Sequence, residues 1–243
     1  MNIIEVKDLV KTLPAGFIGR TEVLHKISFN IPQGVACGFV GNNGAGKTTT
    51  LKCLLEFLTP DKGDIKFFGE ELSVSNRIRL GYLPERPYLY EFLTAWEFLK
   101  FHWNLTYPSS KGFEKRAEEV LKLVGLFDSR DKVMRKFSKG MLQRAGLAQA
   151  LIHNPDLLIL DEPMSGLDPD GRYLVKSILR ELKSQGKTLF FSTHLLEDVD
   201  ELCEYVVIIH HGHVLYNGPL TEFRKQYKNL EEAFAAVKAE VKE

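Results

Sequence analysis

The sequence is poor in several features that would assign it to a particular class of protein. Its 3 cysteines are an odd number and lie far apart, so neither a disulfide framework nor a cysteine metal site is expected, and a reducing compartment fits best. Its 32 basic and 32 acidic side chains cancel, so nucleic-acid binding is not expected. Its longest apolar runs, such as "LLIL", are far short of the roughly 20 residues that span a bilayer, and the N-terminus "MNIIEVKDLV" does not have the pattern of a secretory signal. Any role at a membrane is therefore expected to depend on a partner.

Short apolar segments typical of strands alternate with helical patterns at both ends of the chain. The segments expected as strands are 2–9, 25–31, 35–40, 63–69, 79–84, 157–160, 188–192, 205–210 and 213–218. A loop containing Pro14, Gly16 and Gly19 is expected after the first of them. Residues 86–154 read as mostly helical, and residues 229–243 as a charged helical tail. The pattern predicts an α/β core over residues 1–228 with an inserted helical subdomain.

One glycine-rich stretch follows a continuous apolar run and precedes a helix. It fits the phosphate-loop pattern G-x-x-x-x-G-K-[ST] at every fixed position. Small residues let backbone N–H groups approach a triphosphate, while Lys47 would lie along the β- and γ-phosphates and the Thr48 hydroxyl would hold Mg²⁺. The predicted nucleotide contacts here are Gly41, Asn42, Asn43, Gly44, Ala45, Gly46, Lys47, Thr48 and Thr49. The alternative is a glycine-rich turn without a ligand, and the motif alone does not separate a kinase from a GTPase or an ATPase.

Two acids and a histidine follow two other apolar runs. Asp161 and Glu162 end the run "LLIL", and the carboxyl ends of core strands are where α/β sheets bind ligands. Asp161 would hold Mg²⁺, and Glu162 could orient or deprotonate the attacking water. His194, after the run "LFFS", could bond both that water and the γ-phosphate. The alternatives are a strand that ends in a polar turn and a structural histidine.

Together these motifs resemble the nucleotide-binding subunits of ATP-binding-cassette (ABC) transporters over nearly the whole chain. "GNNGAGKTT" resembles the family's Walker A motif, "LLILDE" its Walker B motif, "SGLD" its D-loop and His194 its switch histidine. "FSKGMLQR" falls where the family has its signature, usually LSGGQ. The resemblance implies a RecA-like P-loop NTPase core with an antiparallel β subdomain, and an ATPase that uses ATP and Mg²⁺.

The resemblance also implies partners. The family works as a head-to-tail pair of cassettes with two ATP molecules between them, and a homodimer is expected here. Ser138, the backbone N–H of Gly140, and Met141 would then face the nucleotide on the other chain, and Asp168 would link the two sites. A separate transmembrane permease would convert dimer closure into transport, which places the chain at the cytoplasmic face of the membrane.

The sequence departs from the family pattern at several positions. Lys139 replaces the first signature glycine, Met141 replaces the glutamine, and Glu85 stands at the Q-loop position, where it could accept from a Mg²⁺-bound water. These departures resemble the subunits of two-component, ABC-2-type exporters. The aromatic residue that stacks on adenine has no clear counterpart, and Leu13 and Phe17 are both candidates.

Two further stretches have competing interpretations. "HHGH" (210–213) resembles a metal cluster, but adjacent histidines on a strand point to opposite faces, so a hairpin turn is the preferred interpretation. The aromatic segment 88–103 is expected to form core, with one helical face holding Leu93, Trp96 and Trp103 and a neighbouring one holding Phe92 and Leu99, and its exposed members to form a groove for a membrane subunit.

Two other functions stay open at this point. One is an ABC ATPase acting on nucleic acid or ribosomes, which neutral charge and the lack of long coiled-coil insertions oppose. The other is a non-hydrolysing, ATP-dependent binding module, which Glu162 and His194 oppose. An exporter ATPase is therefore the preferred interpretation.

Overall fold

The computed structural model describes residues 1–15, 19–225 and 230–239, and in the last helix the side chains up to residue 236. The chain divides into two compact units, Met1–Ser73 with Thr188–Glu243, and Val74–Lys187. Each is described by itself. The predicted limits of the helical insertion (86–154) and of the tail stay a prediction.

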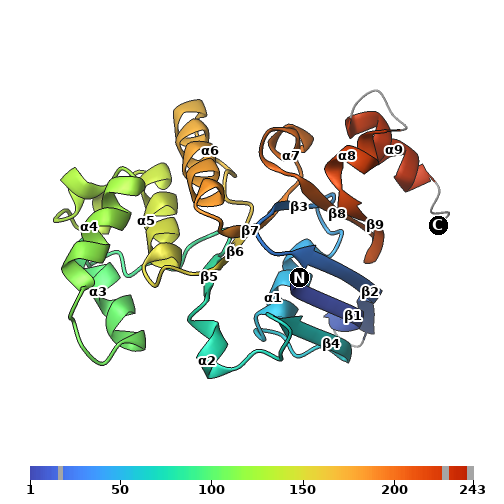
Figure 1. The fold of residues 1–243 in the computed structure, drawn as a ribbon, viewed down its shortest axis with the longest axis horizontal. Coiled ribbons are helices and arrows are strands. Elements are labelled where there is room, and N and C mark those ends of the chain that lie inside the picture. The colour runs from blue at the N-terminus through green and yellow to red at the C-terminus, as the bar shows by residue number, and fades with distance from the viewer. Residues whose placement is uncertain (16–18, 226–229, 240–243) are drawn as a thin grey trace. The chain divides into compact units, whose positions relative to one another are not determined.

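An antiparallel sheet in the first unit has the strand order β2-β1-β4 (Figure 1). Its strands are β1 (Asn2–Ala15), β2 (Gly19–Pro32) and β4 (Lys62–Phe67). In β1, Ile4 and Val6 are buried while Glu5 and Lys7 are exposed, so one face of the strand packs on the core.

The expected loop with Pro14, Gly16 and Gly19 is wrong in its extent. Strand β1 continues to Ala15 and pairs with β2 from Gly19, with Leu13 opposite Thr21. Irregular register between Val6 and Thr12 lets the long hairpin bend, which alternation in the sequence does not reveal. Of the predicted loop, only residues 16–18 lie outside the described part.

The first unit also holds parallel strands. In the order β7-β3-β8 they are Thr188–Thr193, Ala36–Val40 and Tyr205–His210, and β9 (His213–Pro219) pairs antiparallel with β8. Every residue of β3 is buried. The hairpin predicted at "HHGH" is confirmed, because His210 pairs with His213 across the turn. The helices of this unit are α1 (Lys47–Leu54), α7 (Leu196–Leu202), α8 (Leu220–Arg224) and α9 (Leu230–Ala239).

Three buried phenylalanines join the two sheets of this unit. The ring centroid of Phe39 lies 5.8 Å from that of Phe29 and 5.3 Å from that of Phe190. Burying each ring contributes on the order of 1.5–3 kcal/mol to the free energy of unfolding. Strand β3, from which the phosphate loop continues, is therefore held firmly on both sides.

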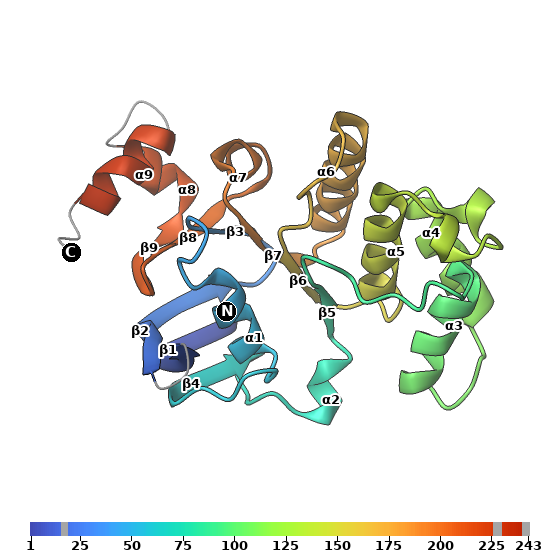
Figure 2. The same ribbon diagram turned by 180° about the vertical axis from the view of Figure 1, so that it is seen from behind.

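The second unit contains two parallel strands and most of the helices. Its elements are α2 (Val74–Arg77), β5 (Leu80–Leu83), α3 (Ala95–Thr106), α4 (Phe113–Leu123), α5 (Lys139–Leu151), β6 (Leu157–Asp161), α6 (Pro169–Ser184) and two 3₁₀ turns, Phe127–Ser129 and Met134–Lys136. Helices α3, α4 and α5 lie side by side in both views (Figures 1 and 2). Within the described residues, no helix has both the length and the apolar character to cross a membrane.

The aromatic segment divides into core and surface. Helix α3 begins only after Thr94, whose hydroxyl accepts from the backbone N–H of Glu97 over 3.1 Å in a capping box. Phe92 therefore precedes the helix. The prediction that Phe92 and Leu99 lie on one helical face is wrong for this reason. Leu99 and Trp103 are buried, whereas Phe92 is 72% exposed. The core interpretation is confirmed for Leu99 and Trp103, and a docking role for the exposed members stays a prediction.

Candidate active site

The phosphate loop leaves the buried end of β3 and continues into α1. Lys47, only 6% exposed, is the first residue of the helix. Its ammonium donates to the carbonyl oxygen of Gly41 over 2.6 Å and to that of Asn42 over 3.3 Å. The lysine thus lies back across its own loop, where a bound phosphate would compete for its charge.

The loop leaves room for phosphate oxygens near its backbone. Gly44 (φ +79°) has nothing within 4 Å of where a Cβ would be, so the space beside it is open. Gly46 (φ +107°) needs to be glycine, because a Cβ there would lie 2.8 Å from Cδ2 of Leu24. No side chain caps the start of α1, and its first turn has no acid. These residues fit the phosphates of ATP, because free N–H groups at a helix start and one lysine make an anion site.

Gly212 supports the phosphate loop from another part of the sequence. Its N–H donates to the carbonyl of Ala45 over 3.0 Å, and its own carbonyl accepts from the N–H of His25 over 2.9 Å. It therefore ties the loop to strand β2. The sequence marked Gly212 only as a turn residue, and nothing local to it signals the contact with residue 45.

His194 directly follows the end of strand β7, at the sheet edge from which the phosphate loop also starts. Strands β3 and β7 are parallel neighbours in which Val40 pairs with Thr193, so the loop from Gly41 and His194 start at the same edge. The side chain of His194 is exposed, and the N–H of Leu195 donates to the Thr193 hydroxyl over 3.0 Å, which fixes the turn. The sequence placed this histidine at the same sheet edge, and the register agrees.

The two predicted carboxylates lie at the end of β6 in the second unit. Asp161 is 1% exposed. Burial, together with the nearby charge of Asp161, raises the pKa of Tyr82 to about 12. Glu162 has φ +49°, a left-handed conformation that is costly for a side chain with a Cβ, and such strain is commonest at functional sites. The N–H of Ser165 donates to its carbonyl over 3.0 Å.

The signature segment forms the start of α5. Ser138 is the N-cap, and its hydroxyl accepts from the N–H of Met141 over 3.3 Å. Arg144, one turn later, donates to the carbonyls of Val124 and Gly125 over 2.8 and 2.9 Å, which anchors the helix to the end of α4.

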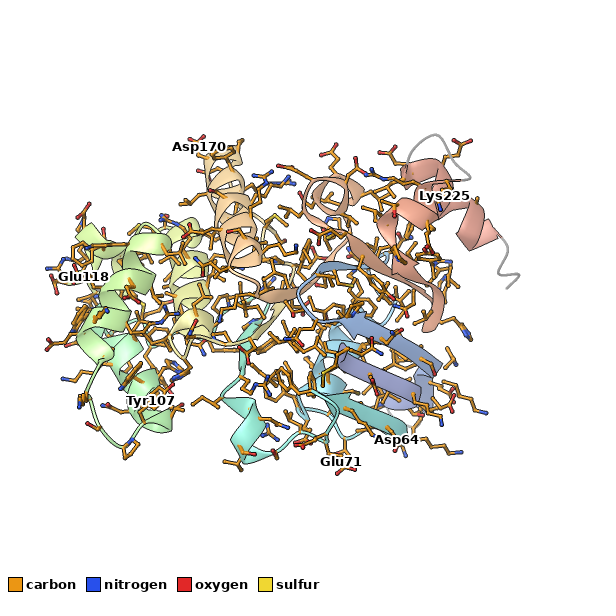
Figure 3. All side chains as sticks on the ribbon, viewed as in Figure 1. Asp64, Glu71, Tyr107, Glu118, Asp170 and Lys225 are labelled. Atoms are coloured by element: carbon orange, nitrogen blue, oxygen red, sulfur yellow. The ribbon has the colours of Figure 1, made fainter. Side chains whose placement is uncertain are left out.

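The D-loop precedes α6. Asp168 caps this helix by accepting from the N–H of Gly171 over 2.9 Å. Figure 3 shows Asp170 at the N-terminal end of the same helix. Glu85, at the Q-loop position, is exposed just beyond β5.

The predicted site residues divide between the two units. The phosphate loop, His194 and Leu13 belong to the first unit. The residues of the second unit are Glu85, Ser138, Gly140, Met141, Asp161, Glu162 and Asp168. Leu13 is half-buried within the β1–β2 hairpin, and Phe17 lies outside the described residues.

Comparisons with known proteins agree with this geometry. The family model described as ABC transporter matches residues 24–165. An uncharacterized ABC transporter ATP-binding protein of Nostoc sp. is 44% identical over 226 residues, which cover 91% of this chain and 68% of the relative. The bacitracin transport ATP-binding protein BcrA of Enterococcus faecalis is 35% identical over 95% of this chain and 73% of its own length.

A solved structure of a dimeric ATP-binding cassette, in a post-hydrolysis state bound to ADP and Pi, has the same fold. Its TM-score is 0.80 with 25% identity, over 89% of this chain and 98% of that one. The mixed α/β architecture, the phosphate loop and these relatives lead to one assignment. The chain belongs to the ABC transporter family, as one of its ATP-binding ATPase subunits.

Proposed function

We propose that this chain hydrolyses Mg-ATP in a reversible dimer and thereby drives export through a separate membrane subunit. The observation that carries the proposal is the phosphate loop, where Lys47 rests on the carbonyls of Gly41 and Asn42 at the uncapped start of α1. The phosphates of ATP would replace these two carbonyls as the partners of the ammonium, and Lys47 would stabilise the charge of the transferred group.

The Mg²⁺ ion would be held by oxygen ligands. Thr48 would contribute its hydroxyl, and the buried carboxylate of Asp161 would bind through water. Glu85 takes the place of the family's glutamine, and its carboxylate would accept a hydrogen bond from a Mg²⁺-bound water. Its negative charge next to the nucleotide would make Mg²⁺ more important for binding than a glutamine does.

Glu162 is our proposed base and His194 the proposed switch. Glu162 directly follows the buried Asp161 at the end of β6, and its backbone is held at φ +49°, the kind of strain that is commonest at functional sites. His194 is exposed at the sheet edge from which the phosphate loop also starts, so its imidazole could bond the γ-phosphate and the attacking water.

The signature would serve a nucleotide bound by a second copy of the chain. Ser138, the N–H of Gly140 and Met141 lie at the start of α5, whose first turn carries no acid. Asp168 would face the partner's site. The dimeric ADP-bound cassette, at 25% identity, supports a dimer here.

The membrane subunit would dock on the second unit, at the cytoplasmic face of the membrane. An aromatic surface is exposed there, formed by Tyr88, Tyr90, Phe92, Phe101 and Leu105. The ring centroid of Tyr90 lies 5.3 Å from that of Phe101 and 5.9 Å from that of Phe92, so these three rings form a contiguous patch of the kind that marks protein interfaces. The similarity to BcrA, a bacitracin transport ATP-binding protein, favours export, as do the departures at Lys139, Met141 and Glu85. Either Leu13 or Phe17 would contact adenine.

Mixed dimers test whether the signature acts across the dimer. A dimer of a Lys47→Ala chain with a Ser138→Arg chain keeps one complete site if the signature serves the partner's nucleotide. A dimer of wild type with a chain carrying both changes then keeps none. We expect ATP hydrolysis from the first and not from the second. The reverse result would mean that Ser138 serves its own chain's nucleotide.

A capture experiment from detergent-solubilised membranes tests the membrane partner. Phe92→Ser is expected to abolish recovery of a polytopic membrane protein while the ATPase rate is unchanged. The control is Phe57→Ser, which removes another exposed phenylalanine, from the first unit. Recovery of ribosomes or nucleic acid with no membrane protein would reject the transport function.

A further inference from the structure

Gln143 carries one of the few polar side chains that are buried in the second unit. Among the described residues of that unit, the buried polar or charged side chains are those of Asn76, Gln143 and Asp161. Gln143 lies on α5, is 6% exposed, and donates from Nε2 to the carbonyl oxygen of Pro163 over 3.3 Å. Buried amide groups are hydrogen-bonded in native proteins, and this bond is what a glutamine supplies here and an apolar residue would not.

The carbonyl that accepts this bond belongs to the residue directly after Glu162. Pro163 and Met164 are buried, so the turn of backbone that follows β6 lies in the interior. Because a proline has no N–H, its carbonyl is the one backbone group through which a hydrogen bond can hold it. Gln143 thus restrains the chain one residue away from the proposed base, whose own φ is +49°.

Helix α5 is itself packed closely against strand β5. A Cβ on Gly81 of the strand would overlap the carbonyl oxygen of Ala150. A Cβ on Gly146 of the helix would lie 2.9 Å from Cδ1 of Leu83. Strand β5 pairs in parallel with β6, the strand that leads to the proposed base. The amide of Gln143 therefore reaches its carbonyl partner from a helix whose place beside these strands is fixed by close packing.

We propose that Gln143 is a positioning residue, which orients the Glu162 carboxylate through its hydrogen bond to the Pro163 carbonyl. This role rests on the proposed function, in which Glu162 activates the attacking water. A base must lie within hydrogen-bond reach of that water, and an error of about 1 Å in position can lower a rate about a hundredfold. The phosphate loop belongs to the other unit, so Gln143 affects the chemical step and not the binding of ATP.

Steady-state ATPase kinetics of Gln143→Met test this role. Methionine keeps the length of the side chain but cannot donate a hydrogen bond. We expect kcat to fall about tenfold while the KM for ATP stays near wild type. The control is Gln149→Met, the same change at a half-buried position of the same helix, which should keep the wild-type kcat. A kcat for Gln143→Met equal to that of the control would overturn the proposal.

A double-mutant cycle with Glu162→Gln separates positioning of the base from general damage to the fold. If Gln143 acts through Glu162, single-turnover hydrolysis by the double variant should equal that of Glu162→Gln alone, because the base is already absent. A structural defect would instead lower the rate by the same factor in both backgrounds. Effects of the two substitutions that multiply would therefore contradict the proposal.

Gln143→Glu keeps the shape of the side chain and makes the hydrogen bond depend on pH. A carboxylate cannot donate to the Pro163 carbonyl, but a protonated carboxyl group can, and burial raises the pKa of such a group. The ratio of the kcat of this variant to that of wild type should therefore rise as the pH is lowered from 8.5 to 5.5. The same ratio for Gln143→Met should stay constant. A constant ratio for Gln143→Glu would overturn the proposal.

Failure of this role for Gln143 can be told apart from failure of the proposed function. If Glu162→Gln hydrolyses ATP at the wild-type rate, Glu162 is not the base and the proposed function fails at that point. If Glu162→Gln loses turnover while Gln143→Met keeps it, only the role of Gln143 is rejected.

Discussion

Acid should destabilise the second unit through His153, the residue two positions beyond the end of α5. The Nδ1 of His153 is buried and has no hydrogen-bond partner within the described residues. Its Nε2 lies 3.3 Å from the Thr106 hydroxyl, and its ring stacks with Trp103 and contacts Tyr107 at the end of α3. Burial, together with the charges of His102 and Arg116, lowers the pKa of His153 to about 4.

The direction of the pH effect on the free energy of unfolding follows from which state of the chain takes up the proton. Between pH 6.5 and 4 the unfolded chain protonates His153 while the folded chain does not, so the free energy of unfolding falls as the pH falls. From pH 7.5 to pH 5 this single group would contribute about 2 kcal/mol if fully shielded, and about 1 kcal/mol after discounting for its partial exposure.

Urea titrations at several pH values, followed by tryptophan fluorescence, measure this effect. Both tryptophans, Trp96 and Trp103, belong to the second unit, so the signal reports on that part of the chain. His153→Gln should reduce the loss of unfolding free energy between pH 7.5 and 5 by about 1 kcal/mol. His211→Gln, a change at an exposed histidine, is the control and should keep the wild-type slope. Equal pH slopes for wild type and His153→Gln would refute the reasoning.

Two other predictions concern the core and the phosphate loop. Leu99→Ala should cost about 2–5 kcal/mol of unfolding free energy in denaturant titrations, whereas Leu105→Ala, at an exposed position of the same helix, should cost less than about 0.5 kcal/mol. Gly212→Ala would place a Cβ 2.7 Å from Cδ2 of His25, and should weaken ATP binding in calorimetry by displacing Ala45. Gly69→Ala is its control, because a Cβ at that position would have nothing within 4 Å. Equal ATP affinities of the two variants would contradict the supporting role of Gly212.

The sequence was sufficient to locate a structural element wherever the residues that form it are adjacent in the chain. The phosphate loop could be located because a strand, a glycine-rich loop and a helix follow one another within about twenty residues. Ser138 could be recognised as a helix cap for the same reason, and the hydrogen bond from Met141 agrees. The strand before Asp161 was visible as an uninterrupted apolar run.

The sequence failed where pairing or contact joins distant segments. Strand β1 continues to Ala15 because it finds a partner in β2, and the intervening irregular register is set by that pairing. The link from Gly212 to Ala45 joins residues far apart in sequence. A glycine signals a special conformation, but its sequence neighbourhood does not reveal which distant atoms require it.

Replacement of Glu162 by Gln tests the central claim most directly. The amide keeps the size of the side chain but cannot accept a proton, so turnover should fall at least about a hundredfold. With Mg-ATP, Glu162→Gln should elute as a stable dimer in size-exclusion chromatography with light scattering, and with Mg-ADP as a monomer. A wild-type hydrolysis rate for this variant, or a failure to dimerise with ATP, would contradict the account.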